Sequence, residues 1–199
     1  MQYQYPLQMS FKVLAFGPQI FIRNVSEQEI FYVHQKAFKL KEDVAVYSNS
    51  SKSNQIFRIQ ADRILDISAE YTLSDAAGSS IGKIKREGMK SLWKASYIIM
   101  DSTGQMTHHV KEDNPWIKVI DSVISSLPIV GIASAFLFHP SYTIYQAGSE
   151  TPVMRVKKQA ALFEGKFTIE SLAEIADPVS ENRILLGVMM MALLERARG

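Results

Sequence analysis

The fold is decided by the stretch YTLSDAAGSSIGKIKR at residues 71–86, which recurs later in the chain. The second copy reads YTIYQAGSETPVMRVKK at residues 142–158, with its turn and basic residues in the same order. A shorter echo, Ile56-Phe57-Arg58-Ile59, precedes both and matches Ile81-Gly82-Lys83-Ile84 and Val153-Met154-Arg155-Val156. Each copy places an apolar residue, any residue, a basic residue and a β-branched aliphatic in succession. Such a recurrence predicts a repeated supersecondary unit.

The sequence around the repeat alternates with a period of two between apolar and polar residues, broken by Gly, Asn, Asp and Ser. This alternation is typical of strands that bury one face. About a dozen short strands with regularly spaced turns favour a barrel or a sandwich. The predicted strands are Leu7–Phe16, Gln19–Arg23, Ile30–Gln35, Val44–Tyr47, Gln55–Gln60, Ala69–Leu73, Ile81–Lys85, Ala95–Met100, Gln105–Val110, Ala133–Phe138, Tyr142–Tyr145, Val153–Lys157 and Gly165–Ile169.

Length and composition set the outer limits of the interpretation. A chain of 199 residues is expected to form one domain, residues 1–199, with a sizeable core. The absence of cysteine excludes disulfides, thiolate nucleophiles and Cys-ligated zinc. Residues 1–21 lack the pattern of a signal peptide, so we expect a cytoplasmic protein, peripheral at the membrane if it meets one. A net charge of +2 is too weak to require nucleic acid as a partner.

Near the C-terminus, residues 184–194 read ILLGVMMMALL and are apolar around the whole circumference of a helix. Asp177 and Pro178 suit the N-cap and first helical position, and Ser180 is an alternative cap one turn later. The apolar run is well short of the roughly 20 residues of a membrane span. A helix that is apolar on every side is therefore expected to lie inside the sheet.

A second apolar segment interrupts the alternation. Asn114 and Pro128 bound a predicted helix near residues 115–127. Residues 122–138 carry no charge, but Pro128 and Gly131 interrupt the run, so a membrane span is disfavoured. A membrane-touching hairpin is one interpretation. The favoured one is a connecting helix packed on the barrel and followed by a buried strand.

Residues 71–86, continued by Trp93, Tyr97–Asp101 and Gly104, resemble the repeated strand pair of the tubby C-terminal-like superfamily. This superfamily includes the LURP-one-related proteins and the phospholipid scramblases. The apolar helix after Asp177 resembles its central helix. The resemblance implies a mainly β fold, a closed barrel of about twelve strands in two similar halves around a C-terminal hydrophobic helix. A barrel of that width needs such a plug, because its own inward side chains do not fill it.

Motifs for catalysis or metal binding are missing from the sequence: there is no HExxH, Walker loop, GxSxG or EF-hand. The adjacent His108 and His109 would point to opposite faces of a strand, whereas a metal site needs converging ligands. Carboxylate pairs such as Glu112-Asp113 are expected in solvated loops. We therefore expect no enzymatic activity, no cofactor and no metal.

The basic residues of the repeat are the feature with functional meaning. Alternation places Lys83 and Lys85 on one face, and Arg155 and Lys157 on the equivalent face of the second copy. Outward basic strips suit anionic lipid head groups, at about 1 kcal/mol for each Lys or Arg near an anionic membrane. The alternative is that they only keep the exterior hydrated. The candidate binding residues are Lys83, Lys85, Arg86, Lys90, Lys94, Arg155, Lys157 and Lys158.

Two functions from different classes follow. The first is a binding module for anionic phospholipid; the resemblance supports it, because tubby domains bind phosphoinositide head groups through basic strand residues. The second is a protein-interaction or scaffold domain that forms a homo-oligomer through the apolar segment 117–138. Membrane or partner contacts are expected at Trp116, Ile129 and Phe136. Nucleic acid is not expected, because aromatic stacking partners beside the basic strips are sparse.

Overall fold

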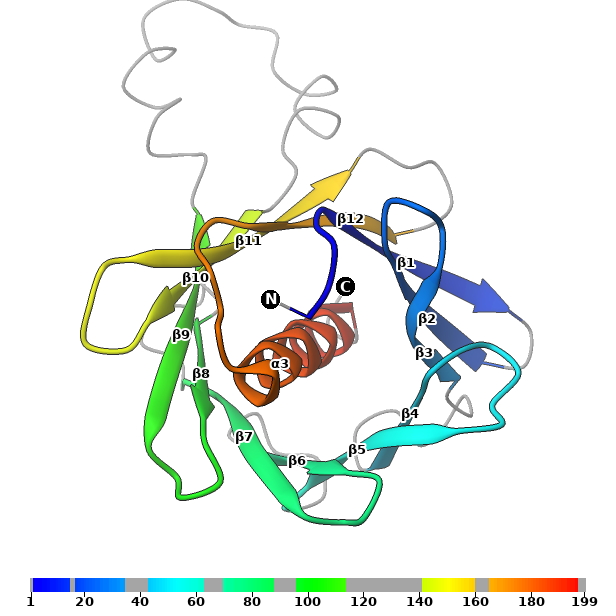
Figure 1. The fold of residues 1–199 in the computed structure, drawn as a ribbon, viewed down its shortest axis with the longest axis horizontal. Coiled ribbons are helices and arrows are strands. Elements are labelled where there is room, and N and C mark those ends of the chain that lie inside the picture. The colour runs from blue at the N-terminus through cyan, green and yellow to red at the C-terminus, as the bar shows by residue number, and fades with distance from the viewer. Residues whose placement is uncertain are drawn as a thin grey trace, which may run out of the picture.

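The structure, a computed structural model, describes residues 2–14, 17–34, 43–62, 70–87, 96–113, 141–159 and 165–196. These residues form a mainly β fold with one helix (Figure 1). The strands are β1 (Leu7–Leu14), β2 (Gly17–Arg23), β3 (Glu29–His34), β4 (Asp43–Tyr47), β5 (Gln55–Ala61), β6 (Glu70–Asp75), β7 (Ser80–Arg86), β8 (Ser96–Met100), β9 (Met106–Asp113), β10 (Ser141–Gln146), β11 (Pro152–Gln159) and β12 (Gly165–Ser171), and the helix is α3 (Pro178–Arg196).

The twelve strands close into an antiparallel barrel in which each strand pairs with its neighbours in sequence. Closure is made by β1 and β12, where Leu7 faces Ile169 and Phe11 faces Gly165 across the seam. Because the barrel is closed, no strand edge is left unpaired. Figure 1 shows the ring of strands around α3, as the sequence and the resemblance predict.

One end of the barrel carries a recurring hairpin turn. The connections after β2, β4, β6 and β8 each begin at an Asn or Asp whose backbone carbonyl accepts a hydrogen bond from the third residue on, at 3.0 to 3.2 Å. The side-chain oxygen of that residue accepts further backbone N–H groups of the same turn, as Asp101 does from Thr103 and Gln105. This bonding is local to each turn. The four turn-forming residues are Asn24, Asn49, Asp75 and Asp101.

The two predicted half-units share an irregularity as well as a sequence. The β6–β7 pairing shifts register after Leu73, and the β10–β11 pairing shifts after Ile144, the equivalent residue of the second copy. Similar shifts occur next to the turns of β2–β3, β4–β5 and β8–β9. Bulges increase strand twist and curvature. Their repetition at equivalent places helps the sheet to curl into a barrel.

Helix α3 runs through the barrel and is its core. Asp177 caps the helix, because its carboxylate accepts the N–H groups of Val179 and Ser180 at 3.0 and 2.9 Å. Every residue from Ile184 to Leu193 is buried. Gly187 lets α3 approach the sheet closely, since a Cβ there would lie 2.9 Å from Ile99 Cδ1. The predicted cap, start and burial are confirmed.

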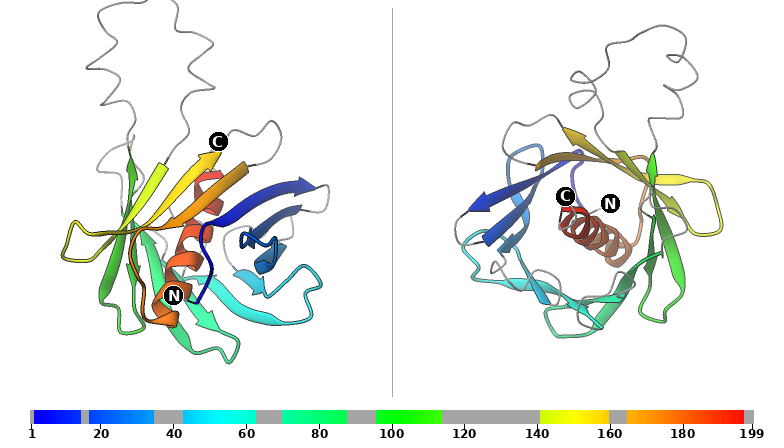
Figure 2. Two further views of the ribbon diagram at one scale, coloured as in Figure 1. Left: turned by 45° about the horizontal axis from the view of Figure 1, so that its top comes forward. Right: turned by 180° about the vertical axis from the view of Figure 1, so that it is seen from behind.

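The chain before β1 also enters the barrel, and Figure 2 shows its blue segment beside the first turns of α3. The Tyr3 hydroxyl donates to Asn182 Oδ1 at 2.7 Å, and the Gln2 N–H donates to the carboxylate of Glu181. The Tyr3 ring packs edge-on against Phe31 at 5.8 Å between centroids. This segment fills part of the barrel mouth where α3 begins.

Two predicted elements, the helix near 115–127 and the strand Ala133–Phe138, lie outside the described residues. None of the helical residues that the structure describes forms a segment long and apolar enough to cross a membrane.

Candidate functional site

The basic residues of the two copies stand on the outer face of the barrel. On β7, Lys83 and Lys85 alternate with the buried Gly82 and Ile84. On β11, the partly exposed Arg155 and Lys157 alternate in the same way with the buried Met154 and Val156. The strands β8, β9 and β10 separate β7 from β11. The two strips are therefore distinct surfaces.

Two of these four cations are matched by carboxylates on a neighbouring strand. Lys83 Nζ lies 2.6 Å from Glu70 Oε1, and Lys157 Nζ lies 2.9 Å from Glu170 Oε2. The hydrogen bond to Glu70, reinforced by its charge, raises the pKa of Lys83. In both pairs the adjacent carboxylate offsets much of the attraction of the lysine for another anion. Exposed pairs of this kind contribute at most about 1 kcal/mol to stability.

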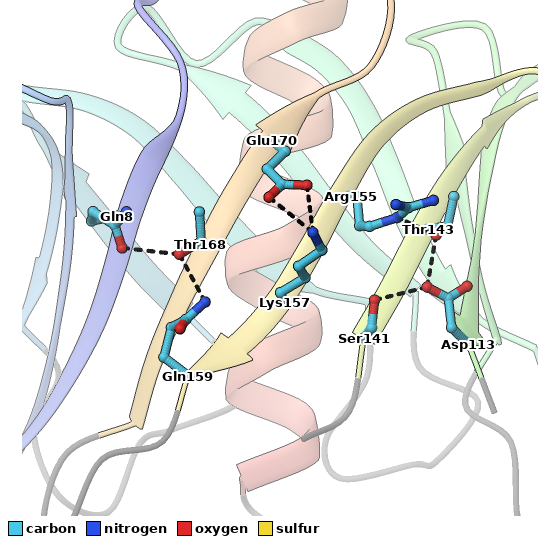
Figure 3. Close-up of polar contacts among 9 residues, drawn as sticks. All are labelled: Gln8, Asp113, Ser141, Thr143, Arg155, Lys157, Gln159, Thr168 and Glu170. Carbon is cyan, nitrogen blue, oxygen red and sulfur yellow. Dashed lines mark hydrogen bonds and ion pairs between the residues drawn. The ribbon is translucent and has the colours of Figure 1, made fainter. Parts of the chain in front are cut away.

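Arg155 lies in a polar network on the outer face, shown in Figure 3. Its Nε donates to Thr143 Oγ1 over 3.5 Å, and Thr143 in turn donates to Asp113 Oδ2 at 2.8 Å. Ser141 donates to the same carboxylate oxygen at 2.8 Å. Asp113 is the last residue of β9, and its carboxylate accepts hydrogen bonds from two hydroxyl groups. The expectation that it is a solvated loop residue is therefore wrong.

The terminal nitrogens of Arg155 differ from those two lysines. Within the described part of the chain, the guanidinium makes no ion pair and no hydrogen bond beyond the one from Nε. Lys85 and Lys158 are exposed and likewise form no ion pair with a described residue. Three cations of the predicted set, Lys85, Arg155 and Lys158, are thus available to an external anion.

The remaining predicted residues are placed differently. Arg86 and Lys158 fall in register with the inward-facing positions of their strands, at the barrel end opposite the start of α3. The Arg86 guanidinium carbon lies 6.0 Å from the centre of the buried Tyr97 ring, so it does not extend the outer strip. Five predicted contact residues lie outside the described residues: Lys90, Lys94, Trp116, Ile129 and Phe136.

The adjacent histidines point in opposite directions, as alternation requires. His108 faces the interior and is buried, whereas His109 faces outward and stacks on Tyr145 at 5.2 Å between centroids. Burial lowers the pKa of His108 to about 4, helped by the positive charges of Arg183 and His109. Among the described residues, no group of three or more His, Asp or Glu side chains converges in the manner of a metal site.

Residues 29–117, from β3 to just beyond β9, match the model of the LURP-one-related family, whose fold is tubby-like. The predicted family resemblance is confirmed. An X-ray structure of a protein from Arabidopsis thaliana aligns over 94% of this chain and 93% of that chain, at 14% identity and a TM-score of 0.49. No curated protein matches the sequence.

Residues 29–117 contact α3 through the buried Arg183, a contact that the sequence did not predict. Glu181 and Arg183 precede the apolar run of α3 and are charged, yet they are only 0% and 7% exposed. Arg183 Nε donates to the carbonyl of Ile81 in β7 at 2.7 Å. The available signal was Gly82, because a glycine within a strand marks a close approach by another group.

Proposed function

We propose that the protein is a non-enzymatic binding module that associates peripherally with anionic lipid surfaces through its outer basic residues. The observation that carries this proposal is the outward Arg155, whose terminal nitrogens have no partner among the described residues. A guanidinium of this kind binds phosphate with two parallel N–H groups. The tubby-like fold of the family, often linked to lipid binding, supports the same conclusion.

The ion pairs identify which cations contribute most. On the outer face, Lys85 and Arg155 attract head groups directly, whereas Lys83 and Lys157 must first leave Glu70 and Glu170. Removing one of those carboxylates should therefore strengthen binding, and removing Arg155 should weaken it. Changes in both directions on one surface are harder to attribute to damage of the fold.

The test is co-sedimentation with phosphatidylcholine vesicles that either lack or contain phosphatidylserine, at low and high salt. We expect binding only to the anionic vesicles, reversed by salt because exposed charges are screened. Arg155→Gln should weaken binding about fivefold, from the loss of about 1 kcal/mol, and Glu170→Gln should strengthen it.

The matched control is Arg58→Gln. Arg58 is an exposed arginine on β5, six strands from β11 and paired with Asp43 at 2.6 Å. It changes the net charge as much as Arg155→Gln does, but on the opposite side of the barrel. Equal losses in the two variants would show that net charge, and no defined surface, drives binding.

The alternative function is a protein-interaction domain that uses segment 117–138. It rests on the uncharged run of residues 122–138. Light scattering on the protein that stays unbound tests it. An oligomer in solution with no binding to either vesicle would reject the lipid proposal in favour of this one.

A further inference from the structure

A charged side chain is enclosed at the barrel mouth where α3 begins. Arg183 belongs to the early turns of α3 and is only 7% exposed. Its Nε is fixed on the carbonyl of Ile81 at 2.7 Å. The helix, the bulged strand β7 and the end of β8 thus hold the guanidinium in one place.

Gly82 leaves room for the side chain of Arg183. A Cβ at Gly82 would lie 2.7 Å from Arg183 Cδ, 2.8 Å from its Nε and 2.3 Å from the carbonyl oxygen of Met100. The Arg183 side chain therefore passes directly over Gly82, through a notch that a side chain at position 82 would fill. The notch ends at the rim of the barrel, beside the β8–β9 turn that begins at Asp101.

Arg183 has no ion-pair partner in the part of the chain that the structure describes. No described carboxylate lies within ion-pair distance of the guanidinium, and Nη1 and Nη2 form no hydrogen bond with a described residue. Buried charges in proteins are normally paired, because the cost of removing them from water is otherwise too large.

His108 lies within electrostatic range of this cation. It is 7% exposed, and on β9 it faces Ile99, the residue before Met100. Its Nδ1 interacts with Thr107 Oγ1 at 3.1 Å, and its Nε2 has no partner among the described residues. The charges near it are Arg183 from α3 and His109 from its own strand, while Asp101 on the rim lies within electrostatic range of Arg183.

We propose that Arg183 and His108 form a binding site for a phosphate-sized oxyanion at the mouth of the barrel. The two Nη groups of Arg183 would donate to the anion, and His108, protonated when the anion is bound, would donate to it from Nε2. Its Nδ1–H is used by Thr107 Oγ1, whose own proton goes to the Ile99 carbonyl. This site lies inside the mouth and shares no residue with the outer strips, so it stands or falls independently of the proposed function.

The test uses the full chain and inorganic phosphate, followed by NMR of the His108 ring at constant ionic strength with chloride as the reference anion. We expect saturable shifts of the His108 signals, and a higher His108 pKa in phosphate because a bound anion favours the imidazolium. Arg183→Gln keeps a donor for the Ile81 carbonyl but removes the charge, so the affinity should fall at least about tenfold. Arg58→Gln, at an exposed arginine on β5 paired with Asp43, is the matched control and should bind phosphate like the unchanged chain.

The wild-type titration alone can overturn the proposal: no saturable shift, or the same shift in chloride, would do so even if Arg183→Gln failed to fold. Equal phosphate affinity in Arg183→Gln would also reject it. Vesicles that contain phosphatidic acid distinguish the source of the phosphate group. If the anion is a lipid head group, Arg183→Gln weakens vesicle binding as well as phosphate binding; if it is a free phosphate compound, vesicle binding does not change.

Discussion

At the scale of single residues, Gly82 serves two requirements at once. Its φ of +151° lies in the region that side chains avoid, and a Cβ would collide with the Met100 carbonyl oxygen at 2.3 Å. We expect Gly82→Ala to lower the free energy of unfolding by about 3 kcal/mol or more, the sum of backbone strain and overpacking.

Gly78 supplies the control for this prediction, measured by urea denaturation. It also has a positive φ, +84°, but nothing lies within 4 Å of its hypothetical Cβ. Gly78→Ala should therefore cost only the backbone term, about 1–2 kcal/mol. If both substitutions cost the same, the steric notch over Arg183 has no energetic consequence.

Because of His108, we expect the free energy of unfolding to fall in acid. Its folded pKa of about 4 lies below the ordinary histidine value of 6.5, so the unfolded chain binds more protons between these two pH values. Stability should therefore fall as the pH drops from about 6.5 to 4, by at most about 3 kcal/mol. His108→Gln removes the titration, and denaturation of both proteins at pH 7 and pH 5 measures the difference. A pH dependence that is the same in His108→Gln would assign the effect to other groups.

At the scale of elements, α3 fills the interior of the barrel, which the inward side chains of the strands do not fill by themselves. Met190 is 0% exposed and belongs to the hydrophobic core cluster. Met190→Asp would bury an unpaired carboxylate, at a cost of several kcal/mol that approaches the whole stability of a domain. We expect a chain with no cooperative thermal transition by circular dichroism. Met190→Leu conserves volume and should lose less than about 1.5 kcal/mol. Cooperative melting of Met190→Asp would mean that α3 is not the essential core.

How much could be predicted from the sequence also depends on the element. Period-two alternation, the apolar helix and its Asp177 cap are local signals, and all three are confirmed in the structure. The outward direction of Lys83 and Arg155 follows from alternation in the same way. A hairpin or a helix can be recognised locally because its hydrogen bonds lie within the segment itself.

The partners of these side chains could not be predicted, because they depend on register. Lys83 meets Glu70, and Lys157 meets Glu170, both 13 residues away but in opposite directions along the chain. Both contacts are diagonal, because Lys83 is in register with Thr72 and Lys157 with Thr168. The register follows from the pairing of whole strands and cannot be read from a local pattern. Arg183 was missed for a related reason: its contact with Ile81 spans 102 positions in sequence and needs the closed barrel.

At the scale of the whole molecule, closure couples the two ends of the chain. The seam pairs β1 with β12, and the residues just before β1 bond to Glu181 and Asn182 at the start of α3. Opening the seam would therefore expose strand edges and also release the segment that covers the helix. This arrangement favours a single cooperative unit over independent halves, although the two halves share a sequence pattern.

Hydrogen exchange of backbone amides tests that coupling. If the barrel opens only as a whole, the amides of Met9 and Phe11 in β1 and of Ile169 in β12 should exchange with the same free energy as Leu186 in the middle of α3. All four residues are at most 2% exposed, so solvent access by itself does not separate them. The seam should also lose its protection in parallel with α3 as urea is added. Exchange at the seam with a free energy several kcal/mol below that of Leu186 would show instead that β1 and β12 separate while the helix stays enclosed.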